Sequence, residues 1–342
     1  MTARITSVAG RQLWDSRGRP TVEAEVTLES GVVGRAIAPA GASRGAHEAV
    51  DLRDGGDAFG GYGVGRAVSA IGVEISPAIM GMDAREQGAV DAALCKLDGT
   101  TNKARLGANA VVAVSMAVLH AAAADARMPL WRYLAEGRSV RIPLPEIQIF
   151  GNIAANELGD SSGYNLALDD RRMSGEEMGA RIIEWTKNYP ILSVEDPAGQ
   201  DDWATMAAVT AAVGDHVQII GDDVLVTNAK RVEDAHAADA CNAALIKVNQ
   251  VGTVTEAKAA LDAAVVHGWG AIVSARSGES EDVTIAHLAT GWDAGQLKVG
   301  SFTRSERMAK WNEMLRIEEA MGSDAVFAGT SAFAAPIAQA LA

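Results

Sequence analysis

The sequence predicts an α/β protein with an N-terminal α+β domain at residues 1–140 and an α/β barrel at residues 141–322, followed by a C-terminal tail at residues 323–342. Two observations support this. The first part combines an alternating strand pattern with alanine-rich helical stretches, and the second part repeats one apolar strand and one helix. A chain of 342 residues with 48% hydrophobic residues is long and apolar enough for two such parts.

The first part contains a predicted hairpin and a predicted buried helix. Residues 21–28 alternate between apolar and polar side chains, which indicates a strand with one buried face, and residues 32–37 can form the returning strand. The small residues at 40–46 are typical of a loop that closes over a site. Residues 107–125 are rich in alanine and valine, which predicts a buried helix.

The second part has a regular spacing. Candidate strands follow one another at intervals of 26, 26, 28 and 25 residues, and they start near Ile191, Val217, Ala243, Ala271 and Gln296. Further strands are possible at residues 145–150 and 164–168. This βα spacing is typical of a parallel barrel, although a complete barrel needs about eight units. We therefore predict an incomplete barrel with fewer than eight βα units.

Charged side chains lie at or near the C-terminal end of each of these apolar strands. They are Glu195, Asp222 with Asp223, Lys247, Arg276 with Ser277, and Lys298. The carboxyl ends of barrel strands form the face that carries active sites. Repetition on five strands favours a catalytic site over separate structural ion pairs.

These residue types suggest a chemistry. Glu195 and Asp222 can hold a hard cation such as Mg²⁺ through oxygen ligands, although a carboxylate-to-lysine salt bridge inside the barrel mouth is the alternative. Lys247 can act as a general base. Arg276 and Ser277 can bind a phosphate or carboxylate, because arginine offers a planar fork of donors.

Composition narrows the partners and the compartment. The net charge of −14 argues against nucleic acid and anionic membranes as partners. We find no uncharged apolar run of 18 residues and no apolar signal core at the N-terminus. Two cysteines, Cys95 and Cys241, do not form a disulfide framework. We expect a cytoplasmic protein.

Several long motifs together resemble the enolase (phosphopyruvate hydratase) family. They are DSRGRPTVE at 15–23, GASRGAHEA at 41–49, LDGTTNKARLGANA at 97–110, SVEDP at 193–197, GDDVLVTN at 221–228, LIKVNQVGT at 245–253, SARSGESED at 274–282 and SERMAKWNEMLRIEE at 305–319. They follow the order of that family and cover the chain to about Gly322. The resemblance implies an N-terminal α+β domain, an α/β barrel and a homodimer.

The resemblance also implies site roles. Glu195 and Asp222 would be Mg²⁺ ligands, and Ser43 in the loop would close on a second Mg²⁺ and on the substrate. Lys247 would remove the α-proton, while Lys298 would hold the substrate carboxylate. Arg276 and Ser277 would hold its phosphate. The implied reaction is the glycolytic dehydration of 2-phosphoglycerate to phosphoenolpyruvate, or that of a close analogue.

The sequence departs from the family pattern beside the expected phosphate site. Where the family reads S-H-R-S-G, this chain has Ala275 before Arg276 and Ser277. In the loop, Ala40 and Arg44 replace a serine and a threonine. These changes favour a paralogue that acts on a related phosphorylated or phosphonate hydroxy acid over an ordinary enolase.

A larger departure lies between Gly151 and Asn152. Roughly 80–90 residues, two or three βα units, have no counterpart there. The absent block carries the family's general-acid glutamate, and Asn152 falls where a third metal carboxylate is expected. Either the full protein contains these residues, or the chain has lost them. The first explanation is favoured because a barrel without them exposes strand edges.

Two function classes therefore remain open. The first is a Mg²⁺-dependent enolase-type lyase whose partner is a small anionic phosphorylated carboxylate. The second is a non-catalytic homologue with a binding or structural role. The second gains weight if Asn152 and the absent block are features of the whole protein.

Overall fold

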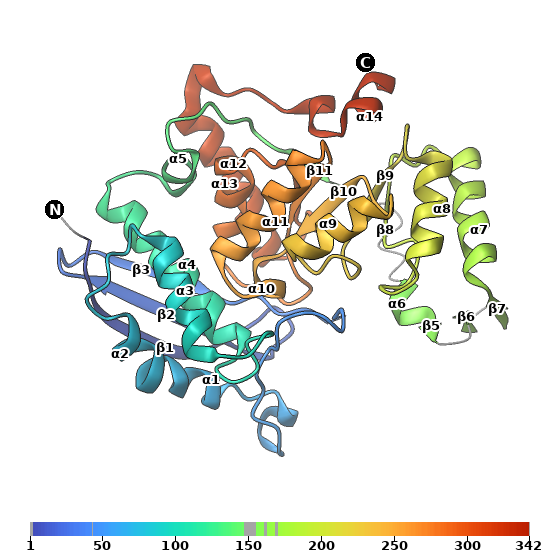
Figure 1. Ribbon diagram of the computed structural model, residues 1–342. Coiled ribbons are helices and arrows are strands. Elements are labelled where there is room, and N and C mark those ends of the chain that lie inside the picture. Colours follow the sequence, from blue (N-terminus) through green and yellow to red (C-terminus); the bar gives the residue numbers. More distant parts are fainter. Residues whose placement is uncertain (1–2, 43, 147–154, 161–162, 168–169, 342) are drawn as a thin grey trace.

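The computed structural model describes all residues except 1–2, 43, 147–154, 161–162, 168–169 and 342. A small antiparallel sheet and its helices lie at one end of the molecule (Figure 1). A curved parallel sheet flanked by helices lies in the middle, and α7 and α8 lie at the other end (Figure 1). The expected α/β fold class is confirmed.

The N-terminal sheet consists of three antiparallel strands in the order β1-β2-β3, with the bounds β1 (Ile5–Trp14), β2 (Pro20–Leu28) and β3 (Val33–Ile37). The alternation read from residues 21–28 corresponds to β2, which buries Val22, Ala24 and Val26 completely. The predicted hairpin of β2 and β3 is therefore confirmed. Hydrophobic residues on one face of the sheet supply the core of this part.

Helix α4 (Ala108–Asp125) packs on this sheet against β2 and β3 and is almost wholly buried. Its length and composition would allow a membrane span, but 83% of the helix is buried inside the protein, as expected of a core helix. The other helical segments of this part are η1 (Ala58–Gly61), α1 (Gly65–Ala70), the π-helical η2 (Ile71–Ile75), α2 (Ser76–Ile79), α3 (Gln87–Asp98) and α5 (Leu130–Ala135).

The central sheet contains six parallel strands in the order β4-β12-β11-β10-β9-β8. Their bounds are β4 (Leu144–Glu146), β8 (Ser193–Glu195), β9 (Gln218–Gly221), β10 (Ala243–Ile246), β11 (Gly270–Ser274) and β12 (Gly295–Lys298). The five strand positions predicted from the spacing agree with β8 to β12. Among the described residues the sheet is half of a barrel, with β4 and β8 as its edges.

The register of these strands separates an inner from an outer face. Gln218 of β9 and Gln296 of β12 exchange two side-chain hydrogen bonds of 2.8 and 3.1 Å, although β10 and β11 lie between their strands. Only a curved sheet brings these side chains together. Gln296 therefore faces the inside of the curve. Its register partner Ile272 on β11 faces the same side, and so does Lys298, two residues further along β12.

Two apolar clusters follow from this alternation. Ile220, Ala243, Leu245 and Ile272 form a small cluster inside the curve. The alternate residues of the same strands, among them Ile219, Ala244 and Val273, belong to the main core between the sheet and its outer helices. This is the layer arrangement of a parallel barrel, in which both faces of each strand are buried.

Helices cover the outer face of the half-barrel (Figure 1). Helix α7 starts with a capping box, in which Ser174 and Glu177 satisfy each other's backbone amides. The helical segments of this part are α6 (Ala155–Leu158), α7 (Gly175–Asn188), α8 (Trp203–Val213), α9 (Ala229–Ala237), α10 (Val248–Val251), α11 (Val254–Val266), α12 (Thr284–Gly291), α13 (Ser305–Met321), η4 (Gly322–Asp324), η5 (Gly329–Ala332) and α14 (Ala335–Ala340).

The strand expected at residues 164–168 does not belong to the barrel. It is β6 (Gly163–Leu166), the middle strand of an antiparallel sheet with β5 (Gly159–Asp160) and β7 (Arg171–Met173). Sequence periodicity identified a strand but not its partners, because antiparallel pairing needs only short turns whereas a parallel neighbour needs a long crossover.

The C-terminal segment closes the amino end of the half-barrel. The amide of Ala328 donates to the carbonyl of Ile142 at 2.9 Å, and the amide of Ile142 donates to the carbonyl of Val326 at 2.8 Å. The side chain of Gln296 donates to the carbonyl of Ala332 at 3.2 Å. Chemistry at the strands is thus confined to their opposite, carboxyl ends.

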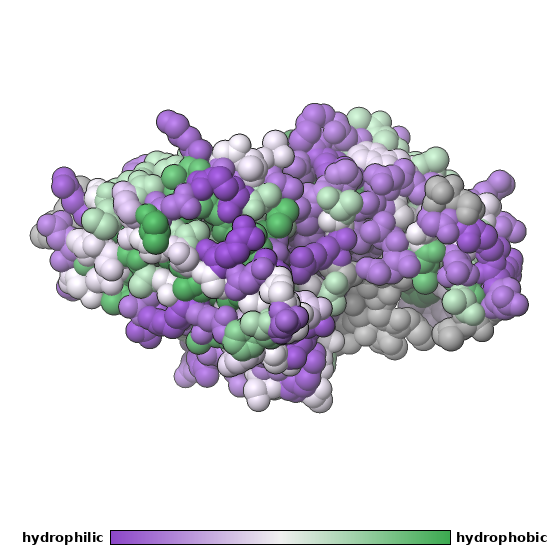
Figure 2. Space-filling view, turned by 90° about the horizontal axis from the view of Figure 1, so that it is seen from below, coloured by the Kyte–Doolittle hydropathy of each residue, from purple (hydrophilic) through white to green (hydrophobic). Residues whose placement is uncertain are grey.

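The surface agrees with the acidic composition. On the face shown in Figure 2, hydrophilic residues predominate, and hydrophobic residues occur in small groups, most of them over the N-terminal part.

Candidate active site at the carboxyl ends of the parallel strands

The charged residues singled out in the sequence lie at or just after the carboxyl ends of β8 to β12. They are Glu195, Asp222, Lys247, Arg276, Ser277 and Lys298. Glu195, Asp222, Lys247 and Arg276 are buried, Lys298 is partly buried and Ser277 is exposed. Ser43 lies outside the described residues, as does Asn152.

Lys247 and Asp222 form a buried ion pair. The ammonium of Lys247 contacts one carboxylate oxygen of Asp222, and the side-chain amide of Gln250 donates to the other at 2.8 Å. Burial opposes ionisation of Asp222, but the positive charges of Lys247 and Lys298 outweigh it and hold the pKa of Asp222 below its usual value. Asp222 is therefore an anion at neutral pH.

Lys298 and Glu195 form a second buried ion pair, across the mouth of the half-barrel. Lys298 ends β12 and Glu195 ends β8, with β11, β10 and β9 between them in the sheet. Burial disfavours the charged lysine, but the carboxyl groups of Glu195 and Glu146 outweigh this and raise the pKa of Lys298. The salt bridge considered as an alternative in the barrel mouth is thus present, in both lysine–carboxylate pairs.

Arg276 is held by a residue of the N-terminal part. Its guanidinium contacts both carboxylate oxygens of Glu48 at 3.1 Å and donates to the side-chain oxygen of Asn249 at 2.8 Å. Burial lowers the pKa of Arg276, but the negative charge of Glu48 raises it by more, so the pKa lies above its usual value. The backbone amide of Arg276 donates to Glu279 at 2.6 Å, and Glu279 pairs with the fully buried Lys310 at 2.9 Å. The guanidinium therefore has a fixed position.

The loop that precedes Glu48 lies against the same end of the half-barrel. Ala40 and Gly278 exchange backbone hydrogen bonds of 2.8 and 2.9 Å, and the amide of Ala42 donates to the hydroxyl of Ser277 at 2.6 Å. The amide of Ala46 donates to the side chain of Gln200 at 2.8 Å. The loop expected to close over a site thus reaches Ser277. Arg44, in this loop, pairs with Asp51 at 2.8 Å.

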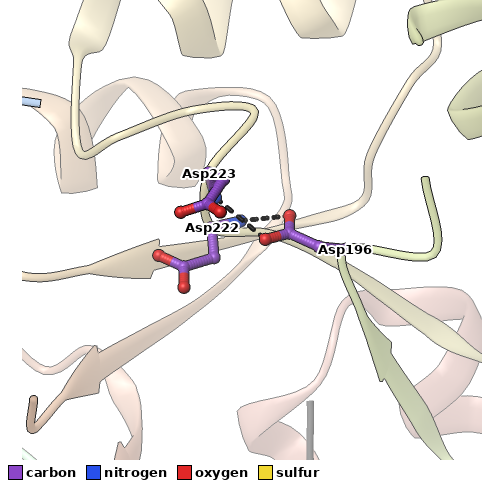
Figure 3. Close-up of side chains that lie close together, drawn as sticks. All are labelled: Asp196, Asp222 and Asp223. Atoms are coloured by element: carbon purple, nitrogen blue, oxygen red, sulfur yellow. Dashed lines mark hydrogen bonds between the residues drawn. The ribbon is translucent and has the colours of Figure 1, made fainter. Parts of the chain in front are cut away.

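Asp196 shapes the turn that carries Asp222. Its two carboxylate oxygens accept the backbone amides of Asp222 and Asp223, each at 2.9 Å. Figure 3 shows the Asp196 carboxyl group facing this backbone, whereas the Asp222 carboxyl group points away from it. Oxygens of Asp196, Asp222 and Asp223 lie within 4.8 Å of one another. Burial, followed by the charge of Asp222, raises the pKa of Asp196 well above its usual value and that of Asp223 to about 6.

This arrangement fits a hard divalent cation. The cluster offers only oxygen ligands. Burial and the charge of Asp222 hinder ionisation of Asp196 and Asp223, a cost that a cation would offset. Because Asp196 already accepts two backbone amides, we assign it to positioning the turn. Asp222 and Glu195, which contact the two lysines of the mouth, offer carboxylates that could hold such a cation.

Glu146 was not identified in the sequence. It is the last residue of β4 and pairs in register with Lys298, so it lies on the inner face at the level of the site. Burial raises the pKa of Glu146 to about 7, more than the charge of Lys298 lowers it. Of the strand expected at 145–150, residues 147–150 lie outside the described residues, and the position of Glu146 follows only from the register of β4 with β12.

Comparison with known proteins gives the family. Residues 5–134 match the family described as "Enolase, N-terminal domain", and residues 143–336 match "Enolase, C-terminal TIM barrel domain". The chain belongs to the enolase family. It is 37% identical to "Enolase 1" of Desulfitobacterium hafniense (strain Y51), with 97% of each chain covered. The family resemblance seen in the motifs is confirmed.

The alignment with that enolase is longer than this chain. It runs over 425 positions, whereas the chain has 342 residues, so at least 83 positions (the difference of the two numbers) have no counterpart here. This number agrees with the size of the absent block inferred from the motifs. The described part of the chain forms a half-barrel of six parallel strands.

The Glu48–Arg276 pair provides a test of this geometry. Glu48→Gln removes the charge and keeps the shape, which leaves a buried guanidinium without its counter-ion. We expect the free energy of unfolding to fall by about 3–5 kcal/mol, measured by urea denaturation. As a control, Asp262→Asn breaks the exposed pair of Lys258 and Asp262. This variant should change the free energy of unfolding by less than about 0.5 kcal/mol. Equal effects of the two variants would contradict the buried pair.

Proposed function

We propose that this protein is a Mg²⁺-dependent enolase-type hydro-lyase. It would remove the α-proton of a phosphorylated 2- or 3-hydroxy acid and eliminate water, as in the conversion of 2-phosphoglycerate to phosphoenolpyruvate or of a close analogue. The observation that carries this proposal is the set of two lysines and two carboxylates at one end of the half-barrel, where Lys247 contacts Asp222 and Lys298 contacts Glu195. Membership of the enolase family supports it.

Each residue has a proposed role. Lys247 accepts the α-proton, and Lys298 binds the substrate carboxylate. Arg276 and Ser277 bind the phosphate, with Ser43 contributed by the loop. Glu195 and Asp222 hold Mg²⁺, which when bound neutralises negative charge that develops on the substrate carboxylate.

The ion pairs have a consequence for this chemistry. Lys247 can accept a proton only after it has lost its own, and its ammonium group is engaged by the carboxylate of Asp222. A cation that binds Asp222 would compete with Lys247 for that carboxylate. In the same way, a substrate phosphate would compete with Glu48 for Arg276. Binding of metal and substrate therefore prepares the base and the anion site together.

We further propose a cytoplasmic homodimer that acts in glycolysis or on a related phosphorylated carboxylate. The alternative is a non-catalytic enolase homologue with a binding or structural role. At least 83 positions without a counterpart in the alignment favour that alternative. The tests below separate the enzyme from the non-catalytic homologue, since the homologue would neither exchange the α-proton of the substrate nor eliminate water from it.

The first test concerns the metal. Asp222→Ala removes a ligand from a site with oxygen donors only, so we expect calorimetry to show Mg²⁺ binding in the wild type and a loss of at least about tenfold in affinity in the variant. Asp262→Ala, which changes an exposed carboxylate on α11, serves as the control. Unchanged Mg²⁺ affinity in Asp222→Ala would remove this residue from the metal site.

The second test concerns the base. Lys247→Ala should abolish exchange of the substrate α-hydrogen with solvent deuterium, because Lys298, the other lysine of the proposed site, is assigned to the substrate carboxylate. Nuclear magnetic resonance of 2-phosphoglycerate in deuterated buffer measures the exchange, and circular dichroism checks the fold. Exchange near the wild-type rate in Lys247→Ala would assign the base to another residue.

The third test concerns specificity. Ala275 is buried and has no donor to offer a phosphate, and a lost charge-assisted hydrogen bond costs on the order of 1.5–3 kcal/mol, or about tenfold to over a hundredfold. We expect weak dehydration of 2-phosphoglycerate and an improvement in Ala275→His, measured by phosphoenolpyruvate formation. Thermal unfolding of the variant shows whether the imidazole fits. A wild-type kcat/KM of about 10⁵ M⁻¹s⁻¹ or above would contradict this prediction.

A further inference from the structure

Glu146 is a carboxyl group on the wall of the proposed site that the roles above leave unused. It lies on β4, beside Lys298 of β12, and the two residues are partners in the parallel register. Because partners in register point to the same face, Glu146 faces the inside of the curve, as Lys298 does. It therefore belongs to the mouth of the half-barrel and not to its outer packing layer.

Both oxygens of Glu146 are buried and have no hydrogen-bond partner among the described residues. The residue is only 9% exposed. A buried polar group without a partner costs free energy, so its presence calls for a ligand or a reaction that uses it.

The surrounding charges explain why Glu146 has no counter-ion. The groups that act on it are Lys298 on β12, Glu195 on β8, Lys247 after β10 and Asp222 after β9. Lys298 is paired with Glu195, and Lys247 is paired with Asp222. Both nearby ammonium groups are thus engaged by other carboxylates, which favours the protonated form of Glu146, consistent with a pKa raised by burial to about 7.

The proposed elimination needs a proton donor. Hydroxide is a poor leaving group, and a positioned acid that protonates it accelerates such a step by about 10²–10⁴-fold. Asp222 and Glu195 are each engaged by a lysine ammonium group, so they are poorly placed for this task. Of the carboxyl groups on the inner face of the described strands, Glu146 is the one with free oxygens.

We propose that Glu146 is the general acid of this site and protonates the hydroxyl group that leaves the β-carbon of the substrate. This inference rests on the proposed function. Lys247 takes the α-hydrogen as a proton, and the electron pair of that C–H bond forms the carbon–carbon double bond. The β-carbon–oxygen bond breaks, and its oxygen leaves as water with the proton of Glu146. Solvent then removes the proton from Lys247 and returns one to Glu146.

The test separates the two proton transfers in the variant Glu146→Gln, which keeps the shape of the side chain and removes the acid. With 2-phosphoglycerate and Mg²⁺, elimination should fall by about 10²–10⁴-fold. Exchange of the α-hydrogen with solvent deuterium should stay within a few-fold of the wild-type rate, because Lys247 is intact. Glu146→Asp, which keeps a carboxyl group, should restore part of the elimination. Glu319→Gln, at an exposed position on α13, is the matched control.

A second substrate distinguishes an acid from a residue that only supports the fold. In the analogue of 2-phosphoglycerate with chloride in place of the β-hydroxyl group, the leaving group needs no proton. Glu146→Gln should therefore eliminate chloride within a few-fold of the wild-type rate. A structural role would slow the elimination of chloride and of water alike, and that result would overturn the proposal.

Three other outcomes would also overturn the acid role of Glu146. Elimination of water at the wild-type rate by Glu146→Gln would show that another group is the acid. Weaker Mg²⁺ binding in that variant by calorimetry, together with lost exchange, would make Glu146 a metal ligand and would overturn the acid role. If the wild type neither exchanges the α-hydrogen nor eliminates either leaving group, the proposed function itself fails, and the acid role with it.

Discussion

The ion pair between Lys298 and Glu195 is the interaction on which the candidate site depends. It joins β12 to β8 across a sheet in which three strands separate them. In a flat sheet those residues would lie more than 15 Å apart by the spacing of about 4.8 Å between neighbouring strands. The contact therefore requires the curvature that also lets Gln218 reach Gln296 one layer deeper. The same curvature directs the side chains at the strand ends toward one mouth.

Charge at this mouth is balanced in pairs. Lys247 neutralises Asp222, Lys298 neutralises Glu195, and Glu48 neutralises Arg276. Buried pairs of this kind contribute little net stability, because desolvation offsets the attraction, but a single unpaired member is costly. An arrangement of this kind can exchange partners: a cation can replace a lysine at a carboxylate, and an oxyanion can replace Glu48 at Arg276. The site is therefore suited to bind a cation and an anion together.

The two parts of the chain build this site jointly. The half-barrel supplies the strand ends, and the N-terminal part supplies Glu48 and the loop that contacts Ser277 and Gly278. Removal of the N-terminal part would take Glu48 away from the guanidinium of Arg276.

The sequence by itself determined the fold class, the order of the strands β8 to β12 and the charged residues at their ends. These are local patterns, since an apolar run followed by a charge can be read within a few residues. Only the tertiary structure decided which of these residues touch. Glu48 and Arg276 are 228 residues apart, and no spacing in the sequence relates them. The same holds for Glu146, whose position depends on its register with Lys298, and for Asp196, whose carboxylate turns away from the mouth to hold the next loop. Register and curvature arise from long-range packing, which cannot be read from local patterns in the sequence.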